Sequence, residues 1–174
     1  NVARIDYSTG QPAILVEPQR TNLVYPSDIA TTQVRAVTSQ VYTLSFYGSG
    51  TVTLSGAFSG SLVGTGANNR VSLTFTPTAG NLTLTVSGSV TNWQLEAGSN
   101  ATSLIPTTTG AVTRNADNVF STNNISSLIG LTEGTLYTEF IASNSTNSNS
   151  GILSLRDSSG DNRLLIRFNV SSLT

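Results

Sequence analysis

Residues 42–47, with the sequence YTLSFY, alternate apolar and polar side chains. Successive side chains of a β-strand point to opposite faces, so a strand here has one wholly apolar face. The two faces are Tyr42, Leu44 and Phe46, and Thr43, Ser45 and Tyr47. The stretch therefore predicts a strand that packs one face against a protein core.

The same alternation recurs on both sides of this strand, at residues 52–54, 71–75 and 82–86. Between residues 47 and 52 the short Gly48–Gly50 link predicts a β-hairpin. Ser55–Asn69 is rich in glycine and is read either as one weak strand around Leu62 and Val63 or as a loop. Short strands at this spacing, with no helical period between them, predict an all-β sandwich or jelly roll.

The composition excludes several kinds of chemistry. The chain has no histidine, cysteine or lysine, so the usual general base, the thiolate nucleophile and the Schiff-base amine are missing. Zinc and most transition metals need imidazole or thiolate ligands. The net charge is −1 and the eight arginines form no basic cluster, which argues against nucleic-acid binding. We expect a protein that is not an enzyme, holds no cofactor, and binds neither nucleic acid nor a membrane.

Two groups of short motifs carry a family resemblance. The first comprises Gln94–Gly98, Ala101–Ser103, Ile105–Thr107, Val112–Arg114 and Ala116–Asp117. The second, near the start, runs from Arg4 to Pro12 and from Leu15 to Leu23. Together they resemble a signature of bacteriophage tail and tail-fibre proteins, in which it bounds a jelly-roll domain similar to carbohydrate-binding modules. The residues assigned to this structural signature are Glu17, Arg20, Asn22, Trp93, Pro106, Arg114 and Asp117.

The resemblance implies a virion protein of a phage tail or fibre, which recognises host-surface glycan or displays a receptor-binding domain. Its expected partners are other tail proteins, further copies of itself in a homotrimer, and a host glycan if the fibre binds sugar. One alternative is a purely structural adaptor or a capsid-decorating fibre that binds only virion proteins. Another is a bacterial carbohydrate-binding module attached to a hydrolase.

Four segments are expected along the chain. Residues 1–31 form an extended lead-in, 32–117 the jelly roll and 118–133 a linker. Residues 134–174 are similar to the first strands of a concanavalin- or laminin-G-like sandwich. They show alternation from Leu136 to Phe140 and a shared apolar face formed by Leu153, Leu155, Leu164, Ile166, Phe168 and Val170. Because these strands are too few to close a core, we expect either that the sequence is a segment of a longer polypeptide or that the strands complete themselves on another chain.

The residues expected to contact a ligand or another subunit lie around the strand that carries Trp93. Strand parity places Trp93 in the core and Asn92, Gln94 and Glu96 on the opposite face. These three side chains either satisfy backbone groups of residues 101–105 folded back on the sheet, or form a polar floor for a glycan or a subunit contact. The aromatic candidates for an exposed sugar platform are Tyr47 and Phe58.

Charged residues elsewhere suggest smaller features. Glu17 and Arg20 are close enough in sequence to form a local ion pair, or Arg20–Asn22 pins the lead-in against the sandwich or a neighbouring subunit. Asp157 and Asp161 flank a glycine and supply oxygen ligands, which makes them weak candidates for calcium. An acidic, glycine-containing segment between strands is ordinarily a turn.

Overall fold

The computed structural model describes residues 4–7, 10–119, 135, 137–139, 150–156 and 163–168. The chain divides into two compact units, Asn1–Phe120 and Ser121–Thr174. The described residues contain strands, turns and extended segments and no helix, so the predicted all-β class is confirmed. None of the described residues therefore forms a helix that could cross a membrane.

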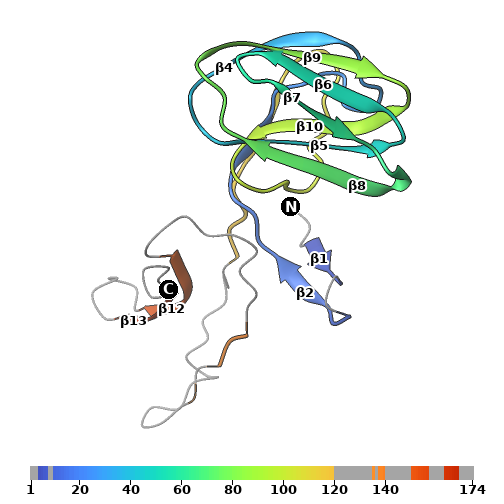
Figure 1. The fold of residues 1–174 in the computed structure, drawn as a ribbon. Coiled ribbons are helices and arrows are strands. Elements are labelled where there is room, and N and C mark those ends of the chain that lie inside the picture. The colour runs from blue at the N-terminus through green and yellow to red at the C-terminus, as the bar shows by residue number, and fades with distance from the viewer. Residues whose placement is uncertain are drawn as a thin grey trace. The chain divides into compact units, whose positions relative to one another are not determined.

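The first unit is a β-sandwich of two antiparallel sheets (Figure 1). One sheet has the order β10-β5-β8, and the other has the order β4-β9-β6-β7. The strands are β4 Gln33–Val37, β5 Tyr42–Gly48, β6 Thr51–Gly56, β7 Gly60–Val63, β8 Gly66–Phe75, β9 Gly80–Ser87 and β10 Val90–Ala97.

The chain changes sheet at almost every connection in this sandwich. Of the consecutive strand pairs from β4 to β10, only β6 and β7 are neighbours in one sheet. The predicted hairpin at Gly48–Gly50 is therefore wrong, because β5 and β6 lie in opposite sheets. Alternation shows that each strand has one face toward a core. Because both sheets face the same core, alternation does not indicate to which sheet the next strand belongs.

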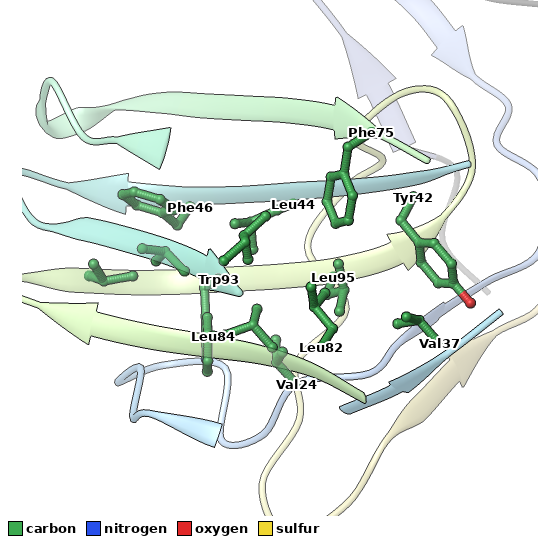
Figure 2. Close-up of a cluster of buried hydrophobic side chains, with 13 residues drawn as sticks. Val24, Val37, Tyr42, Leu44, Phe46, Phe75, Leu82, Leu84, Trp93 and Leu95 are labelled. Carbon is green, nitrogen blue, oxygen red and sulfur yellow. The ribbon is translucent and has the colours of Figure 1, made fainter. Parts of the chain in front are cut away.

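The core lies between the two sheets, where the predicted apolar faces meet (Figure 2). Leu44 and Phe46 of β5 and Trp93 and Leu95 of β10 are fully buried in this cluster. Leu82 and Leu84 of β9, Val52 and Leu54 of β6, and Val24 complete its most deeply buried region. Burial of such side chains is worth about 1.5–3 kcal/mol each, so this core is the main source of stability for the unit.

The glycine-rich stretch contains strand structure rather than a single loop. β7 occupies residues 60–63, as one of the two readings expected, and β8 already begins at Gly66. Gly64 and Gly48 allow a close approach between the two sheets here, since a Cβ added at Gly64 would lie 2.1 Å from the Gly48 carbonyl oxygen.

The second half of the expected lead-in belongs to the sandwich. β3 (Arg20–Asn22) pairs antiparallel with β11 (Val112–Arg114). The segment after β3 then follows the free edge of β10, where the Leu23 N–H donates to the Leu95 carbonyl and the Ala30 N–H to the Val90 carbonyl. The chain thus enters and leaves the sandwich through two adjacent, antiparallel strands.

Shorter paired segments complete the described chain. β1 (Arg4–Asp6) pairs with β2 (Ala13–Leu15) in the first unit. In the second unit β12 (Ser150–Arg156) pairs with β13 (Arg163–Phe168), and the register places Leu153 opposite Ile166 and Leu155 opposite Leu164, of which Leu164 is exposed. Of the alternation predicted from Leu136 to Phe140, residues 137–139 are described and are not in a strand, whereas Leu136 and Phe140 lie outside the described residues.

Candidate functional site

The outer face of β10 carries two polar side chains, Gln94 and Glu96, that are completely buried. Trp93 and Leu95 alternate with them and point into the core. Residues 98–107, which we call the covering segment, fold back across this outer face. The structural alternative predicted for Gln94 and Glu96 requires such a segment, and the following contacts provide it.

Gln94 and Glu96 satisfy the backbone of the covering segment directly. Gln94 Oε1 accepts a hydrogen bond of 2.7 Å from the Ile105 N–H. Glu96 Oε1 accepts one of 2.8 Å from the Thr102 N–H, and Glu96 Oε2 accepts one of 2.7 Å from the Thr102 hydroxyl. Thr102 is itself 1% exposed, so the carboxylate, the carboxamide and the hydroxyl are all shielded from water.

The two polar side chains also contact each other. Gln94 Nε2 donates a 2.6 Å hydrogen bond to Glu96 Oε1 and lies 3.4 Å from Thr102 Oγ1. The orientation of the carboxamide follows from its neighbours, because only its oxygen can accept the Ile105 N–H and only its nitrogen can donate to a carboxylate. We call these three residues, Gln94, Glu96 and Thr102, the buried triad.

Neighbouring strands hold the rest of the covering segment. Thr43 of β5 donates its hydroxyl to the Gly98 carbonyl at 2.8 Å. Arg70 of β8 donates to the Thr102 carbonyl at 2.6 Å and to the Ser45 hydroxyl at 2.8 Å. Thr43 and Ser45 are consequently buried although they lie on the polar face of their strand.

Asn22 connects the segment that enters the sandwich to β10 and to the covering segment. Its Nδ2 donates to the carbonyls of Trp93 and Ile105 at 3.2 and 3.0 Å. Its Oδ1 accepts the N–H groups of Val24 and Leu95 at 3.2 and 3.1 Å. One fully buried carboxamide therefore satisfies backbone groups from three separate stretches of chain.

A second polar cluster, which we call the ionic clamp, joins the two flanks of the sandwich, which are the chain before β3 and the chain from the end of β11 onward. It consists of Arg4, Glu17, Arg114 and Asp117. Glu17 forms ion pairs with Arg4 and with Arg114, the latter at 2.9 Å, and Asp117 pairs with Arg4. The Asp117 carboxylate accepts the Glu17 N–H, and the Asp117 N–H donates to the Glu17 carbonyl, both at 2.9 Å.

The ionic clamp changes the acidity of Asp117. Partial burial by itself would raise the pKa of this carboxyl group. The hydrogen bond from the Glu17 N–H and the charges of Arg4 and Arg114 outweigh that effect, so the pKa of Asp117 lies below its ordinary value. Asp117 therefore stabilises the folded unit in its ionised form.

The expected local pair between Glu17 and Arg20 is replaced by longer-range contacts. Glu17 pairs with Arg4 and Arg114, and its Oε1 also accepts the Ser103 N–H at 2.7 Å. Arg20 instead lies 3.8 Å from the Glu96 carboxylate, beside Gly98. The alternative in which Arg20–Asn22 pins the entering chain against the sandwich describes this arrangement.

The remaining predicted contact residues are not gathered at one place. Asn92 is exposed, with φ of 48°, beside an irregularity in strand pairing, and it stands apart from Gln94 and Glu96. Phe58 is partly buried and stacks on Phe75 with 4.6 Å between ring centroids, so its ring belongs to the edge of the core. Tyr47 is half-buried on β5, and Pro106 is exposed between two buried residues.

Trp93 is fully buried, as predicted, and its indole N–H donates to the Pro26 carbonyl at 2.7 Å. Asp157 and Asp161 lie outside the described residues. Across the region of the chain that is described, no three acidic side chains come together in a way that could hold a metal ion.

Sequence reasoning did not single out Arg4, Arg70 or Thr102 as site residues. Arg4 and Thr102 lie within the two groups of motifs described above, and this position is the one sequence feature that could have pointed to them. Arg70 lies in neither motif, and its role depends on β8 lying beside β5, which no local pattern reveals.

Comparisons of the chain with protein-family models, with curated proteins and with solved structures found no match.

Proposed function

We propose that the protein is a non-enzymatic component of a bacteriophage tail or tail fibre, located in the virion, whose sandwich serves as a structural display module. The phage assignment rests on the sequence motifs and their order. The display role rests on the joined flanks, because β3 and β11 lie side by side and the ionic clamp ties Glu17 to Asp117. A module held in this way projects from a longer chain without interrupting it.

The strand order supports the jelly-roll assignment. The segment after β3 runs beside β10, which adds a fourth member to the three-stranded sheet. A four-stranded sheet and a three-stranded sheet extended by this edge segment, with a chain that crosses between them, resemble the arrangement of the eight-stranded jelly roll.

Burial of the buried triad favours display over sugar binding at that place. A glycan needs hydrogen-bonding side chains it can reach, and Gln94 and Glu96 are covered by the chain's own backbone. The proposed partners are accordingly other virion proteins and further copies of the chain.

Antibodies against the full chain, applied to particles of a phage that encodes it, test the location. We expect gold label on the tail or its fibres. Label absent from intact particles that carry complete tails would contradict the proposal.

A glycan array probed with the full chain tests the display role separately. We expect no retention while circular dichroism shows a folded β protein. Saturable binding of one glycan class would instead assign host-glycan recognition to another surface of the protein.

A further inference from the structure

We propose that the buried triad closes an ester bond between the Thr102 hydroxyl and the Gln94 side chain, with release of ammonia. The bond would form once, within the folded chain, and would fasten the covering segment to β10. This inference rests on the geometry of the triad and not on the proposed virion role.

The contacts of the triad exceed what the covering segment needs. Its two buried N–H groups are satisfied by Gln94 Oε1 and Glu96 Oε1. Two further bonds, from the Thr102 hydroxyl to Glu96 and from Gln94 Nε2 to Glu96, join side chains of the triad to one another. Gln94 Nε2 also contacts the Thr102 carbonyl at 3.5 Å, and Arg20 Nε lies 3.8 Å from Glu96 Oε2. Burying such groups is costly compared with apolar side chains of similar size, so packing alone does not explain the choice.

Glu96 is placed to act as a general base on Thr102. Its Oε2 accepts the hydroxyl proton at 2.7 Å, within the range over which a positioned carboxylate can remove a proton. A hydroxyl paired with a base in this way is the common form of an activated oxygen nucleophile. Both groups are shielded from water, which strengthens their electrostatic interaction.

Gln94 presents the acceptor for this nucleophile. Gln94 Nε2 donates to Thr102 Oγ1 at 3.4 Å, so the hydroxyl oxygen lies beside the amide N–H and must shift toward the adjacent side-chain carbonyl carbon before it attacks. The Ile105 N–H, 2.7 Å from Gln94 Oε1, polarises the carbonyl and can stabilise negative charge that develops on the oxygen. Holding both groups in one buried cluster replaces a bimolecular encounter with a rearrangement inside the folded chain.

The reaction balances without any further reagent. Thr102 Oγ1 bonds to the Gln94 side-chain carbonyl carbon while its proton passes to Glu96. The resulting tetrahedral intermediate then expels the nitrogen, which takes the proton back from Glu96 and leaves as ammonia. The carboxylate is regenerated, and no oxidation or reduction takes place. Glu96 serves both transfers because one of its oxygens contacts the hydroxyl and the other contacts the leaving nitrogen.

Intact-mass spectrometry of the folded 174-residue chain tests the cross-link. We expect a mass lower by one ammonia than the sequence requires. After denaturation, cleavage on the carboxyl side of glutamate cuts between Glu96 and Ala97, and the fragment that ends at Glu96 should remain joined to residues 97–133. Hydroxylamine should separate the two fragments, since it cleaves esters and leaves amide bonds intact.

Matched variants identify the reacting groups. Thr102→Val and Glu96→Gln should each give the unreduced mass and separate fragments, whereas Thr102→Ser retains the hydroxyl and should still form the link. In Glu96→Gln, which removes the cleavage site, the unreduced mass is the readout. Thr107→Val is the control, because the Thr107 hydroxyl is also buried in the covering segment but donates to the Val24 carbonyl. This variant should lose ammonia as the parent does.

Two results would overturn the proposal. One is a folded wild-type chain that keeps its full mass and yields separate fragments after prolonged incubation. The other is joined fragments in Thr102→Val. The wild-type measurement decides the question even if a variant fails to fold.

Discussion

Asn22 shows how much of the structure can depend on one side chain. Its carboxamide makes four hydrogen bonds to backbone groups, all of them buried. Asn22→Leu keeps a similar volume but leaves these groups without partners, and each such loss costs about 1–3 kcal/mol. We expect the free energy of unfolding to fall by about 3 kcal/mol or more, measured by urea titration with Trp93 fluorescence.

Thr21 provides the control for this variant. Its hydroxyl bonds to the Thr113 hydroxyl across the exposed side of β3 and β11, and among the described residues it makes no hydrogen bond to the covering segment. Thr21→Val should change stability by no more than about 0.5 kcal/mol. Equal losses in the two variants would show that the β3 strand, and not the Asn22 carboxamide, carries the effect.

At the same scale, the sequence predicts which residues are buried better than it predicts their partners. Trp93 follows from strand parity. For Gln94 and Glu96, strand parity left open whether residues 101–105 cover them or they form an exposed polar floor, and the covering segment lies on that face. The Glu17 partners Arg4 and Arg114 lie 13 and 97 positions away (114 − 17 = 97), so proximity in sequence favours the wrong arginine.

Among the elements, the turn between β5 and β6 is tightly constrained by backbone contact. Gly48 has φ of 124°, and a Cβ there would lie 2.1 Å from the Ser89 carbonyl oxygen. Gly48→Ala should therefore cost about 3 kcal/mol or more, measured by urea unfolding.

Two further glycines separate the causes of that loss. Gly66→Ala meets no neighbour but has φ of 136°, and it isolates the conformational cost. Gly110→Ala meets no neighbour and has no such φ, so it should be nearly neutral. If Gly48→Ala is no worse than Gly66→Ala, the close approach to Ser89 is not what limits this turn.

The contribution of Asp117 to the contact between the two flanks should be lost in acid. The pKa of Asp117 is lowered in the folded chain, so its contribution is complete above the unfolded value near 3.8 and is lost as pH falls through the folded value. The stability difference between the parent and Asp117→Asn should be largest at pH 7 and should shrink below about pH 4. Urea unfolding at a series of pH values measures it, and a difference that stays constant down to about pH 2 would contradict the assignment.

Element positions were accessible from sequence, whereas their pairing was not. The alternating runs at 42–47, 71–75 and 82–86 mark β5, β8 and β9 because the side-chain period is local. β5 pairs with β8 and β10, which follow much later in the chain, and a local pattern contains no information about such neighbours. The short turn at Gly48–Gly50 has the sequence of a hairpin turn, but it connects strands that lie in different sheets.

On the scale of the whole first unit, the ionic clamp couples residues from its two ends. A double-mutant cycle with Glu17→Gln and Arg114→Gln should give a coupling energy of about 0.5–3 kcal/mol, the range for residues in one charged network. The same cycle with Arg35 in place of Arg114 is the control, since Arg35 stacks over Tyr25 and should be additive with Glu17. Additivity in both cycles would show that the clamp does not join the flanks energetically.

The adjacent ends also determine how the unit would respond to tension. A force applied to the chain before β3 and after β11 first loads the pair Glu17 and Asp117, and then the facing positions Arg20 and Arg114. Because the strands are antiparallel and their outer ends lie together, the hydrogen bonds would break in succession, as in a zipper, and not all at once in shear. Under such a pulling force, β3 and β11 would separate at a small load while strands β4 to β10 of the sandwich stayed intact.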